Sequence, residues 1–213
     1  MTSDADVPTL ETRADIHSSM FRPSQVESQI CNAIAQPATL GKNAQAVLEA
    51  TQQARHTRFL AIPPVLRVAY DLSFDIRGFS LIHFRRFFEG VEEQHTPDAV
   101  NMANFGRSNS LQPANTPAKI GEIVGAFYYL MYFAKCFNNT TVCDFIKTVS
   151  EFIVEYAAFG RPDVSTCTML EYWINSKLGK FRSLIQASNI QVAALVGQEF
   201  MRSDGHLMLT YCC

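Results

Sequence analysis

The sequence has 213 residues, of which 47% are hydrophobic, 11% aromatic and only 18% charged, and its formal net charge is -2 at pH 7. A chain of this length can bury most of the apolar surface that its unfolded form exposes, which suffices for one large domain. The near-neutral charge excludes a strongly basic protein that coats nucleic acid through bulk electrostatics, so any contact with nucleic acid has to be local.

Residues 1–22 are polar and show no sustained apolar period, which predicts a flexible N-terminal arm. The first helix is predicted to begin at Ser24, because Ser24 and Glu27 have the spacing of a capping box, and to end before Pro37. A second helix is predicted from about residue 43 to the proline pair that starts at Pro63.

Apolar residues at three- and four-residue spacing predict a third helix from residue 65 to Gly78. Ser80 is the predicted cap of a fourth helix, which would carry Arg85 and Arg86 beside bulky aromatic residues. Residues 96–116 are rich in Pro, Asn and Ser, which favour turns. A loop of this length is usually functional or disordered, so it is a candidate site or a link between two subdomains.

The C-terminal half has the clearest helical period. Thr116 is the predicted cap and Pro117 the first residue of a helix that runs through residue 134, and because this helix is apolar on every face we expect it to be central and packed on several sides. The next helices are predicted to begin at Thr141, at Thr168 and after Asn189.

These elements predict an all-α fold, a single helical domain over residues 23–203 with seven or eight helices, followed by a short apolar tail at 204–213. No strand pattern and no solenoid repeat is present. The apolar stretch 123–134 is shorter than the roughly 20 residues that a membrane span needs, so we expect no membrane partner.

Cysteine usage indicates a reducing compartment. The six cysteines lack the spacing of a disulfide scaffold, and the N-terminal sequence contains no apolar run that resembles a signal peptide. We therefore expect a cytoplasmic protein with free thiols, in which the glycosylation sequons at Asn138 and Asn139 are unused.

Motifs of catalytic, nucleotide and metal sites are missing from the sequence. Gly121 and Gly125 lie in a predicted helix and lack the Lys-Ser/Thr of a phosphate-binding loop. His206, Cys212 and Cys213 form the only cluster of metal-binding residue types, and three ligands fall short of a structural zinc site. We predict no metal, no cofactor and no enzymatic activity, although a Cys–His pair brought together only in space would escape this search.

One stretch combines cationic and aromatic residues. From Arg55 to Arg107 every cation is an arginine, a residue that forms bidentate bonds with phosphate, while aromatic rings stack on unpaired bases. The predicted nucleic-acid-binding residues are Arg77, Arg85, Arg86 and Arg107, with Phe79 and Phe105 nearby. The alternative is that these arginines form ordinary ion pairs with the acidic residues of the same stretch and that the phenylalanines belong to the core.

Gly78-Phe79, the run Phe84-Arg-Arg-Phe-Phe-Glu-Gly-Val91, and then Pro97 and Ala99 resemble the signature of coat proteins of flexuous filamentous plant viruses. The resemblance covers some twenty residues, with internal spacing that is shorter than in those coats. It implies a mostly helical subunit whose arms link neighbours in a helical filament, with single-stranded RNA in a groove between them.

The leading hypothesis is therefore a viral coat or nucleocapsid-like protein that assembles with copies of itself, binds single-stranded RNA through Arg side chains, and resides in the host cytoplasm and the virion. Many subunits acting together would compensate for few phosphate contacts per subunit. A second hypothesis is a helical protein–protein interaction module, a regulator or effector that does not bind nucleic acid. An enzyme with a spatially assembled site ranks third.

Overall fold

The computed structural model describes residues 21–53, 63–76, 78–85, 111–201 and 204. Within them lie seven α-helices and two 3-10 helices (η) and no named strand, which confirms the predicted all-α fold. The helices are α2 (Gln25–Ile34), α3 (Ala44–Gln53), α4 (Pro63–Ala69), η2 (Leu81–Phe84), α6 (Ile120–Phe137), α7 (Thr140–Ala158), α8 (Val164–Ala187), α9 (Ile190–Ala194) and η4 (Leu195–Glu199). Most of the predicted N-terminal arm, and all of the tail beyond residue 204, lie outside the described residues.

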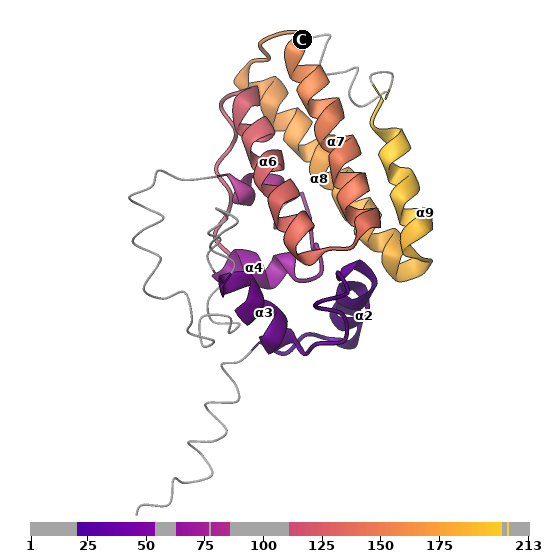
Figure 1. The fold of residues 1–213 in the computed structure, drawn as a ribbon. Helices are drawn as coiled ribbons and strands as arrows, with labels where there is room; N and C mark the ends of the chain where they lie inside the picture. The colour runs from indigo at the N-terminus through magenta and orange to yellow at the C-terminus, as the bar shows by residue number, and fades with distance from the viewer. Residues whose placement is uncertain (1–20, 54–62, 77, 86–110, 202–203, 205–213) are drawn as a thin grey trace, which may run out of the picture.

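Three long helices form the body of the fold. In Figure 1, α6, α7 and α8 run side by side, and α9 with η4 lies along one edge of this group. Apolar residues make up most of their buried sides, and Ile123, Phe127 and Leu130 of α6 are all 0% exposed. Burial of such sides supplies most of the stability of helices this long.

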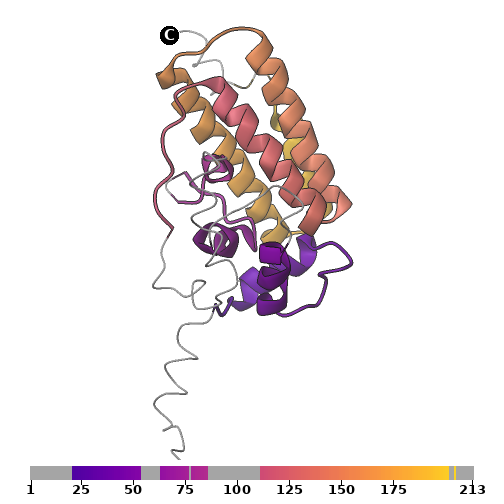
Figure 2. The same cartoon turned by 60° about the vertical axis from the view of Figure 1, so that its left-hand side comes forward.

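The N-terminal helices α2, α3 and α4 gather at the end of the body where α6 passes into α7, as both Figure 1 and Figure 2 show. The end of α2 is tied to that connection by backbone hydrogen bonds, from Gln36 N to Phe137 O at 3.0 Å and from Asn139 N to Ile34 O at 2.7 Å. A single hydrophobic cluster contains residues from both sides of segment 96–116, among them Leu81 and Phe181.

Both predicted glycosylation sequons, at Asn138 and Asn139, lie in the connection between α6 and α7. Asn138 is buried, and the side chain of Asn139 donates to Ala33 O at 2.8 Å while its oxygen accepts the Val142 N–H at 3.2 Å. A glycan on either residue would break these contacts.

Two predicted helices are shorter than expected. The helix predicted to reach Gly78 ends at Ala69, and Leu72 then adopts the left-handed conformation with φ 52°. Ser80 caps the next helix as predicted, with its hydroxyl accepting the Ile82 N–H at 3.1 Å. That element is a 3-10 helix of four residues, and Arg85 follows it in an extended conformation. The predicted continuation through residue 91 lies outside the described residues.

Three predicted caps are wrong. Helix α6 starts at Ile120 rather than after Thr116, so Pro117 lies before the helix. The side chains of Asn139 and Asp163 cap α7 and α8 in place of Thr141 and Thr168. Asn189 caps α9 as predicted, accepting the Val192 N–H at 2.9 Å.

Candidate nucleic-acid interface

Of the four predicted nucleic-acid-binding arginines, the structure describes Arg85. Arg77, Arg86 and Arg107 lie outside the described residues, as does Phe105. Within the described residues, the candidate interface consists of Arg85 and the segment that positions it.

The segment that leads to Arg85 folds back on itself after α4. The rings of Phe74 and Phe79 stack with centroids 4.6 Å apart, and the Asp75 N–H donates to Phe79 O at 2.9 Å. Ser80 then begins η2, where its own N–H donates to His83 Nδ1 at 3.0 Å. These local contacts fix the direction in which the chain reaches Arg85.

Buried polar side chains of α8 hold this segment against the body. Asn175, which is 0% exposed, accepts the Leu81 N–H at 2.9 Å, and its amide nitrogen lies 3.4 Å from the carboxylate of Glu171. Burial raises the pKa of Glu171, while hydrogen bonds from Ser80 and Asn175 act in the opposite direction. A buried polar network with its partners in place fixes a unique arrangement, and here that arrangement is the position of η2 on α8.

Arg85 lies at the surface and is oriented by an ion pair. Its terminal nitrogen lies 3.1 Å from a carboxylate oxygen of Glu122, and the two side chains are 36% and 20% exposed. The same oxygen accepts the Ala118 N–H at 3.0 Å. This acidic partner comes from the first turn of α6.

The segment before α6 is held against η2 by a second contact. Nε2 of His83 lies 2.9 Å from the carbonyl oxygen of Gln112. Together with the Glu122 contact to Ala118, this contact holds both ends of segment 111–119, which forms no regular secondary structure, against η2 and α6.

Phe79 does not belong to this surface. It is 2% exposed and packs on Phe74 and Phe84 in the main hydrophobic cluster. The suggestion that Phe79 stacks on a base is therefore wrong, because the ring has no open face, and the alternative assignment of Phe79 to the core is correct.

Exposed aromatic residues do occur elsewhere, on a surface that the sequence analysis did not single out. Tyr128 and Tyr132 of α6 are 52% and 37% exposed, their rings meet edge to face at 4.8 Å, and their hydroxyl oxygens are 2.9 Å apart. The ammonium of Lys135 lies 5.9 Å from the centre of the Tyr132 ring. α6 is packed on several sides, as expected, against α7, η2 and α8, and Tyr128 and Tyr132 lie on its remaining side.

We call the stripe formed by Gly121, Gly125, Tyr128, Tyr132 and Lys135 the α6 tyrosine face. Its members follow one another at spacings of four, three, four and three residues, which puts them on one side of a helix. That spacing is visible in the sequence, but it is obscured because α6 is apolar on its other sides as well.

The thiols described by the structure offer no reactive centre. Cys31, Cys136, Cys143 and Cys167 are free, as expected, and burial raises the pKa of each, to about 11 for Cys31. Within the described residues, no group of three or more His, Cys, Asp or Glu side chains is placed to hold a metal ion. None of the helices described is long and apolar enough to cross a membrane.

Comparison of this chain with family models, with curated proteins and with solved structures finds no match.

Proposed function

We propose that this chain is a coat- or nucleocapsid-like subunit that assembles with copies of itself and binds single-stranded RNA through Arg85, Arg86 and their neighbours Arg77 and Arg107. The observation that carries the proposal is the placement of Arg85 at the surface, oriented by Glu122. A guanidinium has five N–H donors, and within the described residues the pair with Glu122 uses one terminal nitrogen of Arg85, which leaves donors for a phosphate.

The charges around Arg85 determine how tightly a single subunit is expected to bind RNA. Glu122 neutralises Arg85 locally, so a single Arg85 contributes little net attraction and the adjacent Arg86 has to supply the excess charge. Affinity in such a subunit comes from many copies bound along one strand, which agrees with a net charge of -2.

The test combines RNA binding with particle size. Purified protein is titrated with a fluorescently labelled single-stranded RNA at several salt concentrations, and the products are examined by size-exclusion chromatography and negative-stain microscopy. We expect large RNA-dependent assemblies, and we expect the double variant Arg85→Gln/Arg86→Gln to lower the affinity at least tenfold and to flatten the salt dependence, by about 0.7 in the logarithmic slope per lost phosphate contact.

The control is Arg161→Gln, which removes an exposed cation outside the candidate interface. It should leave both affinity and salt slope unchanged. Equal losses in the control and the double variant, or protein that stays the same size with and without RNA, would contradict the proposal.

A second candidate function, a helical interaction module that does not bind RNA, is favoured by one observation. Phe79 is buried, so the described part of the candidate interface offers no aromatic ring for a base. Arg85 already has an acidic partner, which reduces its net attraction for phosphate. This candidate predicts that no RNA affinity is measurable, and that exposed aromatic surface elsewhere binds a protein.

A further inference from the structure

We infer that a small cavity between the N-terminal helices and the end of α6 is a binding site for one buried water molecule, which joins Asn138 to Thr51 of α3 by hydrogen bonds. This inference goes beyond the proposed function, because it concerns how the N-terminal helices are attached to the body of the fold and holds whether or not RNA is bound.

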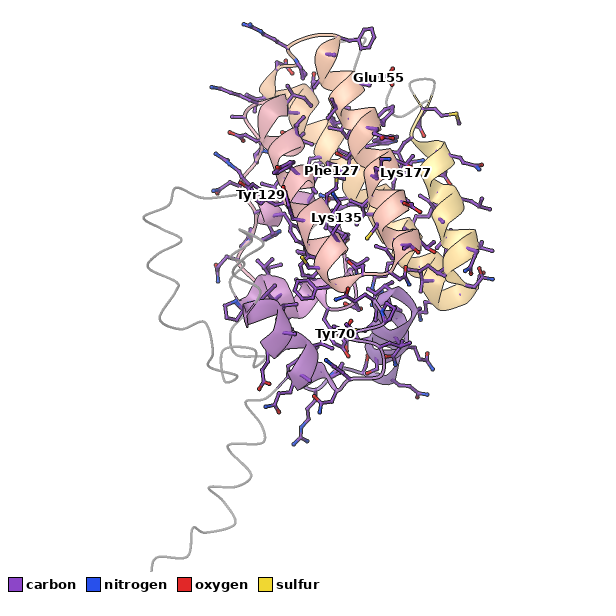
Figure 3. The ribbon with its side chains drawn as sticks, viewed as in Figure 1. Tyr70, Phe127, Tyr129, Lys135, Glu155 and Lys177 are labelled. Atoms are coloured by element: carbon purple, nitrogen blue, oxygen red, sulfur yellow. The ribbon has the colours of Figure 1, made fainter. Side chains whose placement is uncertain are left out.

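The cavity lies where α2, α3 and α4 meet the end of α6. Each of these helices contributes to its lining, and every lining residue is buried. In Figure 3, Tyr70, which is one of the lining residues, lies among the N-terminal helices, beyond the part of α6 that carries Lys135. The volume of the cavity is about 20 Å³. A buried water needs at least about 10–15 Å³, so the cavity has room for one.

Asn138, which follows α6 and lines the cavity, carries a buried acceptor that lacks a donor. The residue is 7% exposed, and its side-chain nitrogen Nδ2 lies 3.5 Å from Ile34 O. Its side-chain oxygen Oδ1 meets no hydrogen-bond donor among the described residues. Exchanging the two amide atoms would bring two oxygens together at Ile34, so Oδ1 stays on the side away from Ile34. Because buried acceptors are normally bonded to protein or to ordered water, the water-sized cavity beside Asn138 is the place from which a donor can come.

Thr51 supplies a second partner for the water. It is 6% exposed and lines the same cavity. Its hydroxyl donates to Leu48 O at 2.7 Å, so the lone pairs of its oxygen remain to accept a hydrogen bond. A water molecule has two hydrogens and can therefore donate to Asn138 Oδ1 and to Thr51 Oγ1 at once.

A third group completes the set of polar partners. The thiol of Cys31, on α2, also lines the cavity and is a weak donor to the oxygen of a water. Buried waters typically make about three hydrogen bonds, and Asn138, Thr51 and Cys31 together offer that number.

The water bridge attaches α3 to the body of the fold. The end of α2 is bonded directly to the α6–α7 connection through Gln36 N to Phe137 O and Asn139 N to Ile34 O. α3, by contrast, packs mainly against α4 among the described helices. A water-mediated hydrogen bond is enthalpically nearly as favourable as a direct one. A water between Thr51 and Asn138 therefore gives α3 its own link to the connection that already holds α2.

The first experiment is a high-resolution crystal structure of the full chain, in which the probe is water itself. We expect density for a single water at about 2.7–3.0 Å from both Asn138 Oδ1 and Thr51 Oγ1. Crystals pressurised with xenon should show no xenon at this position, because xenon occupies dry, apolar cavities. Xenon in the cavity, no density beside Asn138 Oδ1, or a water bonded to the nearby Thr39 in place of Thr51 would overturn the inference.

The second experiment measures the attachment of α3 in solution by amide hydrogen exchange. Thr51→Val keeps the shape of the side chain and removes the hydroxyl, so the amides of α3 should exchange about tenfold faster than in the natural chain, while those of α7 keep their rates. Thr168→Val is the matched control. It also removes a hydroxyl that bonds within its own helix, to Val164 O at 2.8 Å, but Thr168 does not line the cavity, so the exchange of α3 should not change.

Two results of the exchange measurement would contradict the bridge: α3 amides that exchange at the same rate in Thr51→Val as in the natural chain, or an equal acceleration of α3 in Thr168→Val. Neither experiment uses RNA or alters Arg85, so its outcome is separate from a failure of RNA binding.

Discussion

Arg182 of α8 donates from Nε at 3.0 Å, and also from a terminal nitrogen, to the same carboxylate oxygen of Asp71, a residue 111 positions earlier in the chain. The carboxylate is 2% exposed and its other oxygen accepts the Ser73 hydroxyl. Burial raises the pKa of Asp71, and the guanidinium and the Ser73 hydroxyl oppose that rise. This contact holds the turn after α4 against α8 and thereby places the segment that leads to Arg85.

Removing one partner of this pair should cost more than removing both. We expect Asp71→Leu and Arg182→Met each to lower the free energy of unfolding by about 3 kcal/mol, because each leaves a poorly hydrated charge or donor unpaired. The double variant Asp71→Leu/Arg182→Met should recover at least half of the summed loss. Urea unfolding followed by circular dichroism measures the cycle, and losses that simply add would show that the two side chains stabilise the fold independently.

The buried Glu171 should make stability depend on pH in a defined direction. Its pKa is raised in the folded state, so the protonated form is favoured there, and this contribution to stability is lost as the pH rises from the unfolded-state value through the folded-state pKa. Glu171→Gln stays neutral and should be more stable than the natural chain at pH 7. A gain of about 1 kcal/mol raises the melting temperature by about 2–4 °C in a chain of this size.

The difference should disappear as the pH is lowered toward 4, which thermal unfolding across that range will show. Glu151→Gln changes an exposed carboxylate that pairs with Lys147, and it should move the melting temperature little at any pH. A Glu171→Gln protein that is less stable at pH 7 would mean that the carboxylate charge itself is needed by the network around Ser80 and Asn175.

The start of α7 offers a direct comparison between a predicted and an observed cap. Asn139→Ala removes the cap of α7 and the hydrogen bond to Ala33, and should lower the free energy of unfolding by about 1–2 kcal/mol. Thr141→Ala, which changes the cap predicted from the sequence, should stay within about 0.5 kcal/mol of the natural chain. If Thr141→Ala lowers the free energy of unfolding more than Asn139→Ala does, the cap of α7 is Thr141 and not Asn139.

The sequence predicts which helix faces are buried better than it predicts where the helices begin and end. The apolar period of Ile123, Phe127 and Leu130 predicts their burial, because a stripe on one side of a helix has to meet a core. Capping motifs are short and recur by chance inside helices, where a threonine can bond to its own helix, as the Thr168 hydroxyl does with Val164 O at 2.8 Å. The fold class was therefore predictable, and the ends of several helices were not.

The candidate site was less predictable, because its contacts join residues that are distant in sequence. Arg85 pairs with Glu122, 37 positions away, and no local pattern distinguishes that carboxylate from the nearer acidic residues. Phe79 reads equally well as a surface aromatic or a core residue until its stacking on Phe74 is known. Tertiary packing decides both assignments, and a single sequence does not encode it as a local signal.

Gly179 is a helix-interior glycine whose replacement should destabilise the fold, although alanine favours helices by about 1 kcal/mol. A Cβ atom at this position of α8 would lie 3.0 Å from the backbone carbonyl oxygen of Phe74, which the stacked pair of Phe74 and Phe79 holds in place. Gly179→Ala should therefore lower the melting temperature by several degrees, since backbone atoms have to move. Gly125→Ala changes a position of α6 at which a Cβ atom would meet no described atom within 4 Å, so it should raise the melting temperature or leave it unchanged. If both variants are stabilised, the turn at Phe74 and Phe79 can move away from α8 without cost, and the close approach of the two segments does not hold the Arg85 segment in position.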